Sequence, residues 1–304
     1  MDAQGLAALG YGRARRRDRA LRAPLVMNPQ GLEEHKTHGL KRLALSRLRA
    51  LSREAARLAD RVIATDLSTR DDVPRLLGVD PARVVVLPNG VDTDEIAAAT
   101  PPDACARAEA AVPALAGARE VFLSVGRLEG YKGLEDAAAA LASLAGSGRL
   151  GPAWAWVIVG QGPAGTALRR SLAPAVAART HFAGHVDEPT LHALYERADL
   201  LVHPTRYEGS SLVTLEAMAH GRAVVATRAG GIPDKVVEGV TGLLVPPADP
   251  VALASALATL IGDVDRRAAM GAAGRGRVRA EFAWSALVDR VLALYEELLR
   301  EARG

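Results

Sequence analysis

The sequence predicts an α/β protein with two Rossmann-like domains, each a doubly wound parallel sheet. In the C-terminal two thirds, short apolar runs alternate with amphipathic helical stretches, which is typical of a parallel sheet covered on both faces. About ninety residues before them repeat this alternation with fewer apolar runs. A chain of 304 residues with 49% hydrophobic residues is large and apolar enough to form two cores.

The N-terminal part contains three convincing strand candidates. They are Pro24–Met27, Arg61–Thr65 and Arg83–Leu87. A long helix is expected over residues 37–59, where leucine and alanine recur at intervals of three and four. Because a doubly wound nucleotide-binding domain usually has about five or six strands, we expect the N-terminal domain, residues 1–97, to be incomplete.

The C-terminal domain, expected over residues 98–281, shows a regular order of strands and helices. Its expected strands are Val121–Val125, Trp154–Val159, His181–Ala183, Leu200–His203, Ala223–Ala226 and Leu243–Val245. Residues 282–304 are expected to form a C-terminal helix that packs back on the N-terminal domain. No G-x-G-x-x-G motif follows the opening strand of either half, which argues against a dinucleotide-dependent dehydrogenase.

Composition narrows the class of protein. Cys105 is the single cysteine, which excludes a disulfide framework and a cysteine-built metal site and indicates a reducing, cytoplasmic compartment. No run approaches the roughly 20 apolar residues that span a bilayer, and no signal peptide opens the sequence. We therefore expect a soluble protein.

Basic residues are concentrated in residues 1–61, which hold fourteen Lys and Arg against six Asp and Glu. A GC-rich genome, which favours arginine codons, is the simpler explanation. Attraction to an anionic membrane face or to an anionic acceptor is the functional one. The segment lacks the aromatic interleaving typical of nucleic-acid binding, so no nucleic-acid partner is expected.

Candidate ligand-binding residues follow the expected strands, because ligands of an open parallel sheet bind beyond the carboxyl ends of its strands. Gly126, Arg127 and Lys132 lie in the first such loop of the C-terminal half. Two cations in a glycine-bearing turn suit a diphosphate, although two solvated loop residues explain them equally well. Gly160 and Gly162 follow the next strand and allow the backbone to approach a ligand closely.

The loop after the fourth strand of this half leads into a helix that begins at about Leu212. Free backbone N–H groups and the helix dipole favour phosphate binding at such a position. Glu208 precedes the helix and Glu216 lies in its first turns, so both carboxylates are placed to accept hydrogen bonds from sugar hydroxyls. Support of the helix start is the structural alternative for Glu216.

Glu208 and Glu216, with seven residues between them, form an E-x7-E pattern that resembles retaining GT-B glycosyltransferases of family 4, the glycosyl transferases group 1. Further segments resemble the same family in the same order: PNGVD, GRLEGYKG, VGQGP, FAGHV, ADLLVHPTRYEGSSLVTLEAMAHG and AGGIPDKVVEGVTGLLVPPAD. The resemblance implies the GT-B fold, in which two Rossmann-like domains face a cleft, here with a truncated N-terminal domain.

The resemblance also implies roles for individual residues. Arg127, Lys132 and Glu208 are the catalytic candidates: the two cations would hold the donor diphosphate and Glu208 would contact the donor sugar. Glu216 would bind the ribose hydroxyls. Besides Gly126, Gly160 and Gly162, the donor-binding candidates are His185 and Val186 near the nucleobase and Gly209, Ser210, Ser211 and Leu212 around the sugar and phosphate.

The acceptor side departs from the family pattern. No glycine-rich loop precedes Pro24, and where many members carry a histidine followed by glycine, this sequence has Gln30 and Gly31. These two residues are the acceptor-side candidates. An amide can hydrogen-bond a sugar hydroxyl but does not titrate as histidine does.

No bound metal or cofactor is expected. D-x-D patterns, which bind metal in another large glycosyltransferase fold, occur at Asp92/Asp94 and Asp263/Asp265. The first lies in the PNGVD turn and the second joins two late helices, so neither context suits a catalytic metal.

The sequence thus favours a retaining, metal-independent hexosyltransferase. It would use a UDP- or GDP-linked sugar and a hydroxyl acceptor on a glycan, a lipid-linked sugar or a small metabolite, with peripheral contact at the inner membrane face. The alternative is a non-catalytic fragment that binds nucleotide sugar but lacks a complete acceptor domain. A further GT-B enzyme, such as a nucleotide-sugar epimerase, is disfavoured by the context of the E-x7-E pattern.

Overall fold

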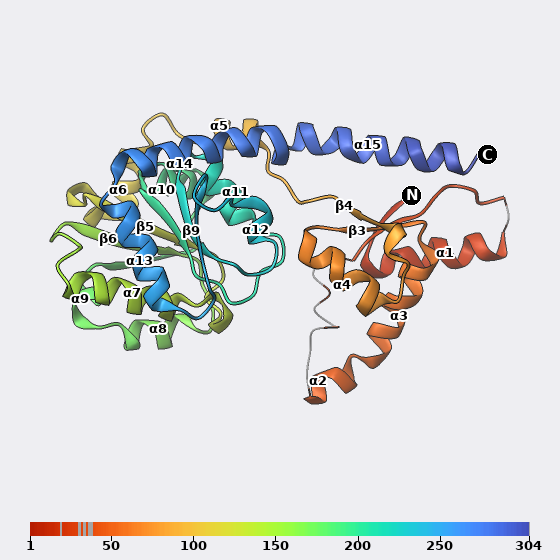
Figure 1. Ribbon diagram of the computed structural model, residues 1–304, viewed down its shortest axis with the longest axis horizontal. Coiled ribbons are helices and arrows are strands. Elements are labelled where there is room, and N and C mark those ends of the chain that lie inside the picture. Colours follow the sequence, from red (N-terminus) through yellow and green to blue (C-terminus); the bar gives the residue numbers. More distant parts are fainter. Residues whose placement is uncertain (19, 30–31, 33–34, 36–38, 304) are drawn as a thin grey trace. The chain divides into compact units, whose positions relative to one another are not determined.

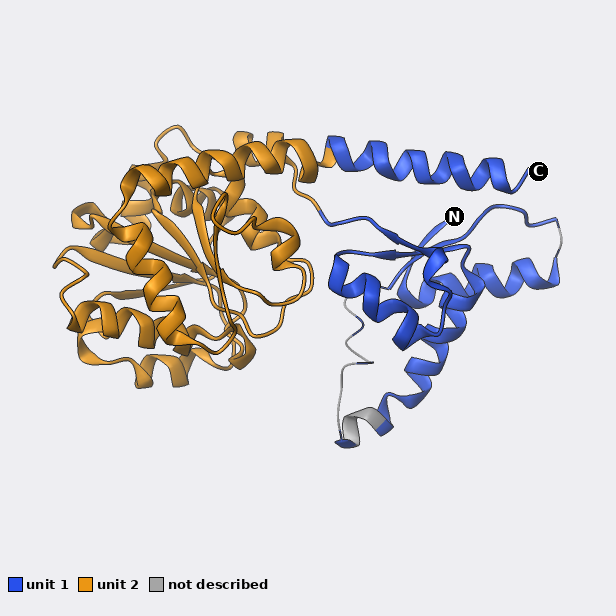
Figure 2. Cartoon of the chain, viewed as in Figure 1, with its two compact units in different colours: residues 1–89, 285–304 blue, residues 90–284 orange. Residues whose placement is uncertain are grey.

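The computed structural model describes residues 1–303 except 19, 30–31, 33–34 and 36–38. The chain divides into two compact units: unit 1 comprises residues 1–89 and 285–304, and unit 2 comprises residues 90–284 (Figure 2). The first limit lies eight residues before the expected boundary at 97/98, and the second lies three residues after the expected boundary at 281/282. The reason is that Val91 pairs with Ala283, and the indole of Trp284 donates to the carbonyl of Gly90, so both connecting segments belong to unit 2.

Unit 1 contains a four-stranded parallel sheet in the order β1-β2-β3-β4 (Figure 1). Its strands are Asp2–Gln4 (β1), Val26–Asn28 (β2), Arg61–Ala64 (β3) and Val84–Val86 (β4). The prediction of only three strands in this part of the chain was therefore wrong. Strand β1 is three residues long and buries a single side chain, Ala3, so no alternating apolar run marks it in the sequence.

The helices of unit 1 are α1 (Ala8–Arg17), α2 (Gly39–Ala44), α3 (Ser46–Leu58), α4 (Leu67–Leu77) and residues 285–301 of α15 (Trp284–Glu301). Helices α1, α3 and α4 cover one face of the sheet and α15 covers the other, while α2 contacts α3. The long helix expected over residues 37–59 is divided at Leu45, and its first two residues lie outside the described ones.

Neighbouring residues of the central strands point to opposite faces, as the pleat of a strand requires. Leu25 and Met27 pack in the cluster formed with α1, α3 and α4. Val26, between them, packs instead with Leu294 and Leu298 of α15. The sheet of unit 1 is thus buried on both faces.

Unit 2 contains a six-stranded parallel sheet in the order β10-β9-β8-β5-β6-β7. Its strands are Glu120–Val125 (β5), Trp154–Val159 (β6), Thr180–Gly184 (β7), Leu200–His203 (β8), Ala223–Thr227 (β9) and Gly242–Val245 (β10). Each agrees with an expected strand within one or two residues.

The helices of unit 2 lie on both sides of this sheet (Figure 1). They are α5 (Thr93–Ala99), α6 (Ala104–Ala111), α7 (Leu134–Gly146), α8 (Gly165–Ser171), α9 (Pro174–Ala177), α10 (Glu188–Arg197), α11 (Leu212–Ala219), α12 (Ile232–Lys235), α13 (Pro250–Ile261) and α14 (Val264–Arg277). A π-helical turn, Val278–Phe282, follows α14.

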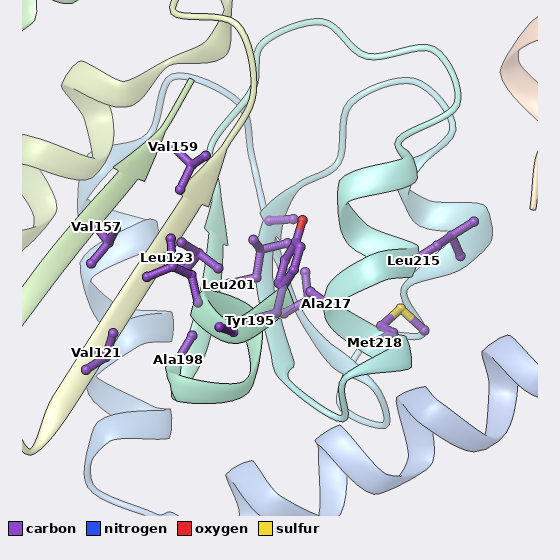
Figure 3. Close-up of a cluster of buried hydrophobic side chains, with 14 of the residues drawn as sticks. Val121, Leu123, Val157, Val159, Tyr195, Ala198, Leu201, Leu215, Ala217 and Met218 are labelled. Atoms are coloured by element: carbon purple, nitrogen blue, oxygen red, sulfur yellow. The ribbon is translucent and has the colours of Figure 1, made fainter. Parts of the chain in front are cut away.

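The two cores of unit 2 follow the same alternation along each strand. Val121 and Leu123 of β5 face the cluster that contains Tyr195 of α10 and Leu215 of α11 (Figure 3). Phe122, between them, faces the opposite cluster with α7 and α13. This arrangement confirms the prediction of a doubly wound parallel sheet and fixes the strand ends from which the site is built.

Candidate functional site

The strand order of unit 2 reverses next to β5. From β5 the chain proceeds to β6 and β7 at one edge, then returns to β8 on the other side of β5 and continues to β9 and β10. All these strands are parallel, so their carboxyl ends lie along one edge of the sheet. Ligands of such sheets bind outside the carboxyl ends where the order reverses. The loops after β5 and β8, residues 126–133 and 204–211, flank this position.

Two glycines allow the loops at this edge to approach each other closely. Gly133 has a φ of +64°, and a Cβ there would overlap the backbone carbonyl of Pro204. Gly160 has a φ of +124°, and a Cβ there would overlap the carbonyl of Gly126. Other residues rarely adopt these φ values, so the backbone contacts between the loops depend on glycine.

An ion pair joins the loops after β5 and β8. Lys132 Nζ lies 2.8 Å from Glu208 Oε2, and both side chains are only 15% exposed. The same carboxylate oxygen lies 3.0 Å from Nε2 of His203, the last residue of β8. The structure therefore brings together two of the three catalytic candidates and adds a histidine to them.

The environment of Glu208 favours its charged form. Burial raises its pKa, but the hydrogen bond and charge of His203, together with the charge and hydrogen bond of Lys132, outweigh burial and lower the pKa to about 2. Glu208 is consequently an anion at neutral pH, and Lys132 is its counter-ion.

Helix α11 begins beside this carboxylate. Ser211 caps the helix: its hydroxyl accepts from the Thr214 N–H, and its carbonyl accepts from the Thr214 hydroxyl. Within the described part of the chain, the backbone N–H groups of residues 209–212 donate to no protein acceptor. Free N–H groups at a helix start, together with the helix dipole, form a site for a phosphate group.

The segment around α12 holds this loop in position. The buried Lys235 Nζ donates to the Ser210 hydroxyl at 2.7 Å, and the Gly231 N–H donates to the Gly209 carbonyl at 3.2 Å. Gly230, with a φ of +51°, lies against the backbone of Glu208 so closely that a Cβ would overlap the Glu208 carbonyl. The candidate phosphate-binding residues thus have a fixed backbone.

Glu216 lies on α11 and contacts α10. Its Oε2 accepts a 2.7 Å hydrogen bond from the Tyr195 hydroxyl. Burial raises the pKa of Glu216, while the Tyr195 hydrogen bond and the charge of His220 act in the opposite direction. Burial and the charge of Glu216 raise the pKa of Tyr195 well above its usual value, so the phenol remains a donor. Glu216 is thus oriented by a neutral hydroxyl.

The other candidates are more exposed. The Arg127 side chain is 76% exposed and pairs with Glu129 at 2.6 Å, so it lies apart from the Lys132–Glu208 pair. Gly162 is in contact with the backbone of Leu128, which ties the loop after β6 to the loop after β5. His185 is exposed after β7, whereas Val186 packs against the core that contains Tyr195.

Two candidates lie outside the described residues, and sequence reasoning missed three others. Gln30 and Gly31 belong to the part of the chain that is not described. The missed residues are His203, Tyr195 and Lys235. A usable signal existed for His203, a polar residue that closes an apolar strand, and for Lys235, one of four lysines in an arginine-rich chain.

The aspartate pairs have a structural role at helix starts. The Asp92 carboxylate accepts from the N–H groups of Asp94 and Glu95, and that of Asp263 from the N–H of Arg266. Both are therefore N-caps, of α5 and α14 respectively. Among the described residues, no three or more His, Cys, Asp or Glu side chains are grouped so that they could hold a metal ion. No described helix has the length and apolar character that crossing a membrane requires.

The fold is that of a two-unit α/β protein, with a candidate phosphate-binding site at the strand reversal of its second unit. Comparison with known proteins identifies the family. A family model described as glycosyl transferases group 1 matches residues 119–263, and one described as glycosyltransferase family 4 matches residues 2–95. The chain belongs to this family of GT-B glycosyltransferases.

The names of individual relatives refer to different substrates. The chain is 33% identical over 274 residues to a glycogen synthase of Mycobacterium tuberculosis, covering 90% of this chain and 63% of that protein. It is 37% identical over 218 residues to a GDP-mannose-dependent alpha-(1-6)-phosphatidylinositol monomannoside mannosyltransferase of the same species, covering 69% of this chain and 55% of that protein. The chain thus spans about three fifths of the length of these curated relatives.

Among solved structures, the sucrose-phosphate synthase of Thermosynechococcus elongatus matches with a TM-score of 0.78 and 25% sequence identity. The match covers 99% of this chain and 73% of that structure. Both units of the chain therefore have counterparts in a GT-B glycosyltransferase.

Proposed function

We propose that this protein transfers a hexose from a nucleoside diphosphate sugar to a hydroxyl acceptor, with retention of anomeric configuration and without a bound metal. The observation that carries the proposal is the Lys132–Glu208 ion pair beside the start of α11, at the strand reversal of unit 2. A cation, a carboxylate and free N–H groups thus lie at one edge of the sheet. The name of the GDP-mannose-dependent relative supports a nucleotide sugar as the donor.

In this proposal, charge determines where each part of the donor binds. The diphosphate lies against the N–H groups of residues 209–212 and draws the Lys132 ammonium from Glu208. The exposed Arg127 closes on the diphosphate from the loop after β5. Glu208, freed from part of its pairing, accepts hydrogen bonds from the hexose hydroxyls, and Glu216, oriented by Tyr195, binds the ribose hydroxyls.

The transfer step needs positioning and charge stabilisation more than it needs a titrating protein base. The bond between the anomeric carbon and the leaving phosphate oxygen breaks, and the acceptor oxygen bonds to that carbon from the same face. The leaving phosphate oxygen takes the acceptor proton. Lys132 and Arg127 offset the charge that develops on the nucleoside diphosphate, which is the role a metal ion would otherwise have.

Acceptor and location belong to the same proposal. The names of the relatives contain glycogen and phosphatidylinositol monomannoside, which favours a glycan or a lipid-linked sugar as the acceptor. We place the protein in the cytoplasm, with its basic segment, residues 1–61, in contact with the anionic inner membrane face. Fractionation of cells with and without high salt tests this location. We expect part of the protein to sediment with membranes at low salt and to be released from them by high salt. Absence of the protein from the membrane fraction at low salt would contradict the membrane contact.

Calorimetric titration tests the donor site. We expect the chain to bind one of UDP-glucose, UDP-N-acetylglucosamine and GDP-mannose with EDTA present, and Glu216→Ala to weaken that binding. Glu297→Ala, an exposed residue of α15, is the matched control and should bind as the wild type does. Absence of donor binding by the folded chain would overturn the proposal. Binding without transfer to any acceptor would instead favour a non-catalytic nucleotide-sugar-binding protein.

A further inference from the structure

Unit 1 contains a pocket that the proposed transfer reaction does not use. It has a volume of about 560 Å³, and all of its lining residues belong to unit 1. Six arginines line it: Arg15, Arg16, Arg22, Arg57, Arg61 and Arg83. The acidic residues in the lining are Asp60 and Glu301. The pocket therefore carries a large excess of positive charge.

The pocket lies at the amino edge of the unit 1 sheet. Pro24, Asp60 and Arg83 line it, and they come directly before or within two residues of β2, β3 and β4. These strands are parallel, so the carboxyl ends, where a Rossmann-like domain normally binds its ligand, lie at the opposite edge. A ligand in this pocket would be additional to any donor or acceptor.

Three of the arginines are held by the protein itself. The Arg15 guanidinium forms a bidentate pair of hydrogen bonds with the Asp60 carboxylate, at 2.5 and 3.2 Å, and also donates to the Leu58 carbonyl. Arg61 pairs with Glu301 at 2.7 Å. Arg83 donates to carbonyls at the end of α3, including that of Ala59. These bonds use both acidic groups of the lining and fix half of the guanidinium groups.

Within the part of the chain that the structure describes, the other three arginines pair with no carboxylate. Arg16, Arg22 and Arg57 are exposed, and among the described residues none of their side chains forms a hydrogen bond or an ion pair. Arg16 affects a carboxylate only through its charge, which helps to lower the pKa of Glu54. Arginine-rich composition explains how many arginines the chain has, but not why six converge on one pocket with two carboxylates.

We infer that this arginine pocket binds an anion with several phosphate groups. A guanidinium presents a planar fork of donors that matches phosphate oxygens bidentately, and convergent cations repel one another until an anion is bound. The unpaired Arg16, Arg22 and Arg57 would hold the anion, while Arg15, Arg61 and Arg83 form the fixed wall. A metabolite with several phosphate groups and a phospholipid headgroup with more than one phosphate share this chemistry.

Titration calorimetry with inorganic tripolyphosphate at low ionic strength tests the inference on the full chain. We expect the double variant Arg22→Ala/Arg57→Ala to lose affinity by about tenfold or more, since two charge-assisted contacts are removed. The matched control Arg47→Ala/Arg70→Ala removes the same charge from exposed arginines of unit 1 outside the pocket. It should change affinity by less than about twofold, because screened surface charges contribute little. Circular dichroism checks that both variants are folded.

Lys132→Ala separates this site from the donor site, since tripolyphosphate binding to unit 1 should persist in that variant even if nucleotide-sugar binding is lost. Wild-type affinity in Arg22→Ala/Arg57→Ala, or an equal loss in the control, would overturn the inference. Vesicles of cardiolipin, whose headgroup has two phosphate groups, mixed with phosphatidylcholine then distinguish the two sources. A lipid headgroup is supported if the wild type sediments with the vesicles, tripolyphosphate reverses this sedimentation, and Arg22→Ala/Arg57→Ala does not sediment. Tripolyphosphate binding without sedimentation supports a soluble phosphorylated ligand.

Discussion

Lys132 and Glu208 form a 2.8 Å ion pair between two loops that are far apart in the sequence and adjacent at the strand reversal of unit 2. The pair has two consequences. It keeps an anionic carboxylate in a mostly buried position, and it occupies the cation that the proposed diphosphate needs. Donor binding must therefore redistribute the Lys132 ammonium between Glu208 and the phosphate oxygens, while His203 continues to bond to the carboxylate.

Replacement of Lys132 by alanine is expected to weaken donor binding while the fold is retained. A hydrogen bond to a charged group contributes about 1.5–3 kcal/mol, so we expect the Kd for the nucleotide sugar to rise by about tenfold to a hundredfold. Calorimetric titration measures this change. Arg206→Ala is the control, because this exposed arginine of the neighbouring loop pairs with Asp136. An unchanged Kd in Lys132→Ala would remove the cation from the proposed site.

Replacement of Glu208 by glutamine is expected to reduce stability at neutral pH but not in strong acid. The pKa of Glu208 falls from 4.5 to about 2 on folding, so its charged form stabilises the fold above pH 4.5. That contribution, about 3 kcal/mol at most, is lost as pH falls through about 2. Urea unfolding at several pH values measures it by tryptophan fluorescence, which reports on unit 2 because Trp154, Trp156 and Trp284 all belong to it.

The control for this pH series is Glu129→Gln, which changes a carboxylate of the neighbouring loop that pairs with the exposed Arg127. It should show a small and nearly constant difference from the wild type. If Glu208→Gln and the wild type differ equally at pH 7 and pH 2.5, the carboxylate does not titrate as its surroundings require.

Much of unit 2 could be predicted from sequence because its strands are buried on both faces. Strand β6 was expected over Trp154–Val159 and has those bounds, since six consecutive apolar or aromatic residues end at a glycine turn. Strand β1 could not be predicted, because its three residues are held by pairing with β2 and not by apolar character of their own.

The sequence predicts the site only to the extent that the ends of the strands determine where its residues lie. Lys132 and Glu208 follow strands that become neighbours, so their proximity follows from the topology. Which of two nearby cations would reach the carboxylate does not follow, because Arg127 and Lys132 both carry one positive charge and the local sequence does not specify where the turn directs each side chain. The bond between Tyr195 and Glu216 joins two helices whose packing no local pattern specifies.

Replacement of Tyr195 by phenylalanine is expected to shift the pH dependence of donor binding. The hydroxyl lowers the pKa of Glu216 against the effect of burial, so its loss should raise that pKa further and move the acidic limit of donor binding to higher pH. The free energy of unfolding should fall by about 1 kcal/mol, the contribution of one hydrogen bond. Donor Kd measured from pH 4.5 to pH 8 shows the shift.

Tyr11→Phe provides the matched control for Tyr195→Phe. The Tyr11 hydroxyl donates to the Ala23 carbonyl at 2.8 Å in unit 1, so this variant also loses one hydrogen bond but leaves unit 2 unchanged. It should lower stability without moving the pH dependence of donor binding. Identical pH profiles for the wild type and Tyr195→Phe would show that the hydroxyl does not act on Glu216.

Replacement of Gly133 by alanine is expected to separate the loops that carry Lys132 and Glu208. Its φ of +64° is unfavourable for alanine, and the added Cβ would overlap the Pro204 carbonyl, so the loop after β5 must move. Strain of this kind costs about 1–3 kcal/mol, and we expect both the free energy of unfolding and donor affinity to fall. Gly130→Ala is the control three residues earlier, since its φ is not positive and a Cβ there meets no atom within 4 Å. The loop after β5 carries Lys132, the cation on which donor binding depends, so its displacement should be visible in donor affinity. Equal donor affinity in Gly133→Ala and Gly130→Ala would show that the contact with Pro204 has no role in the site.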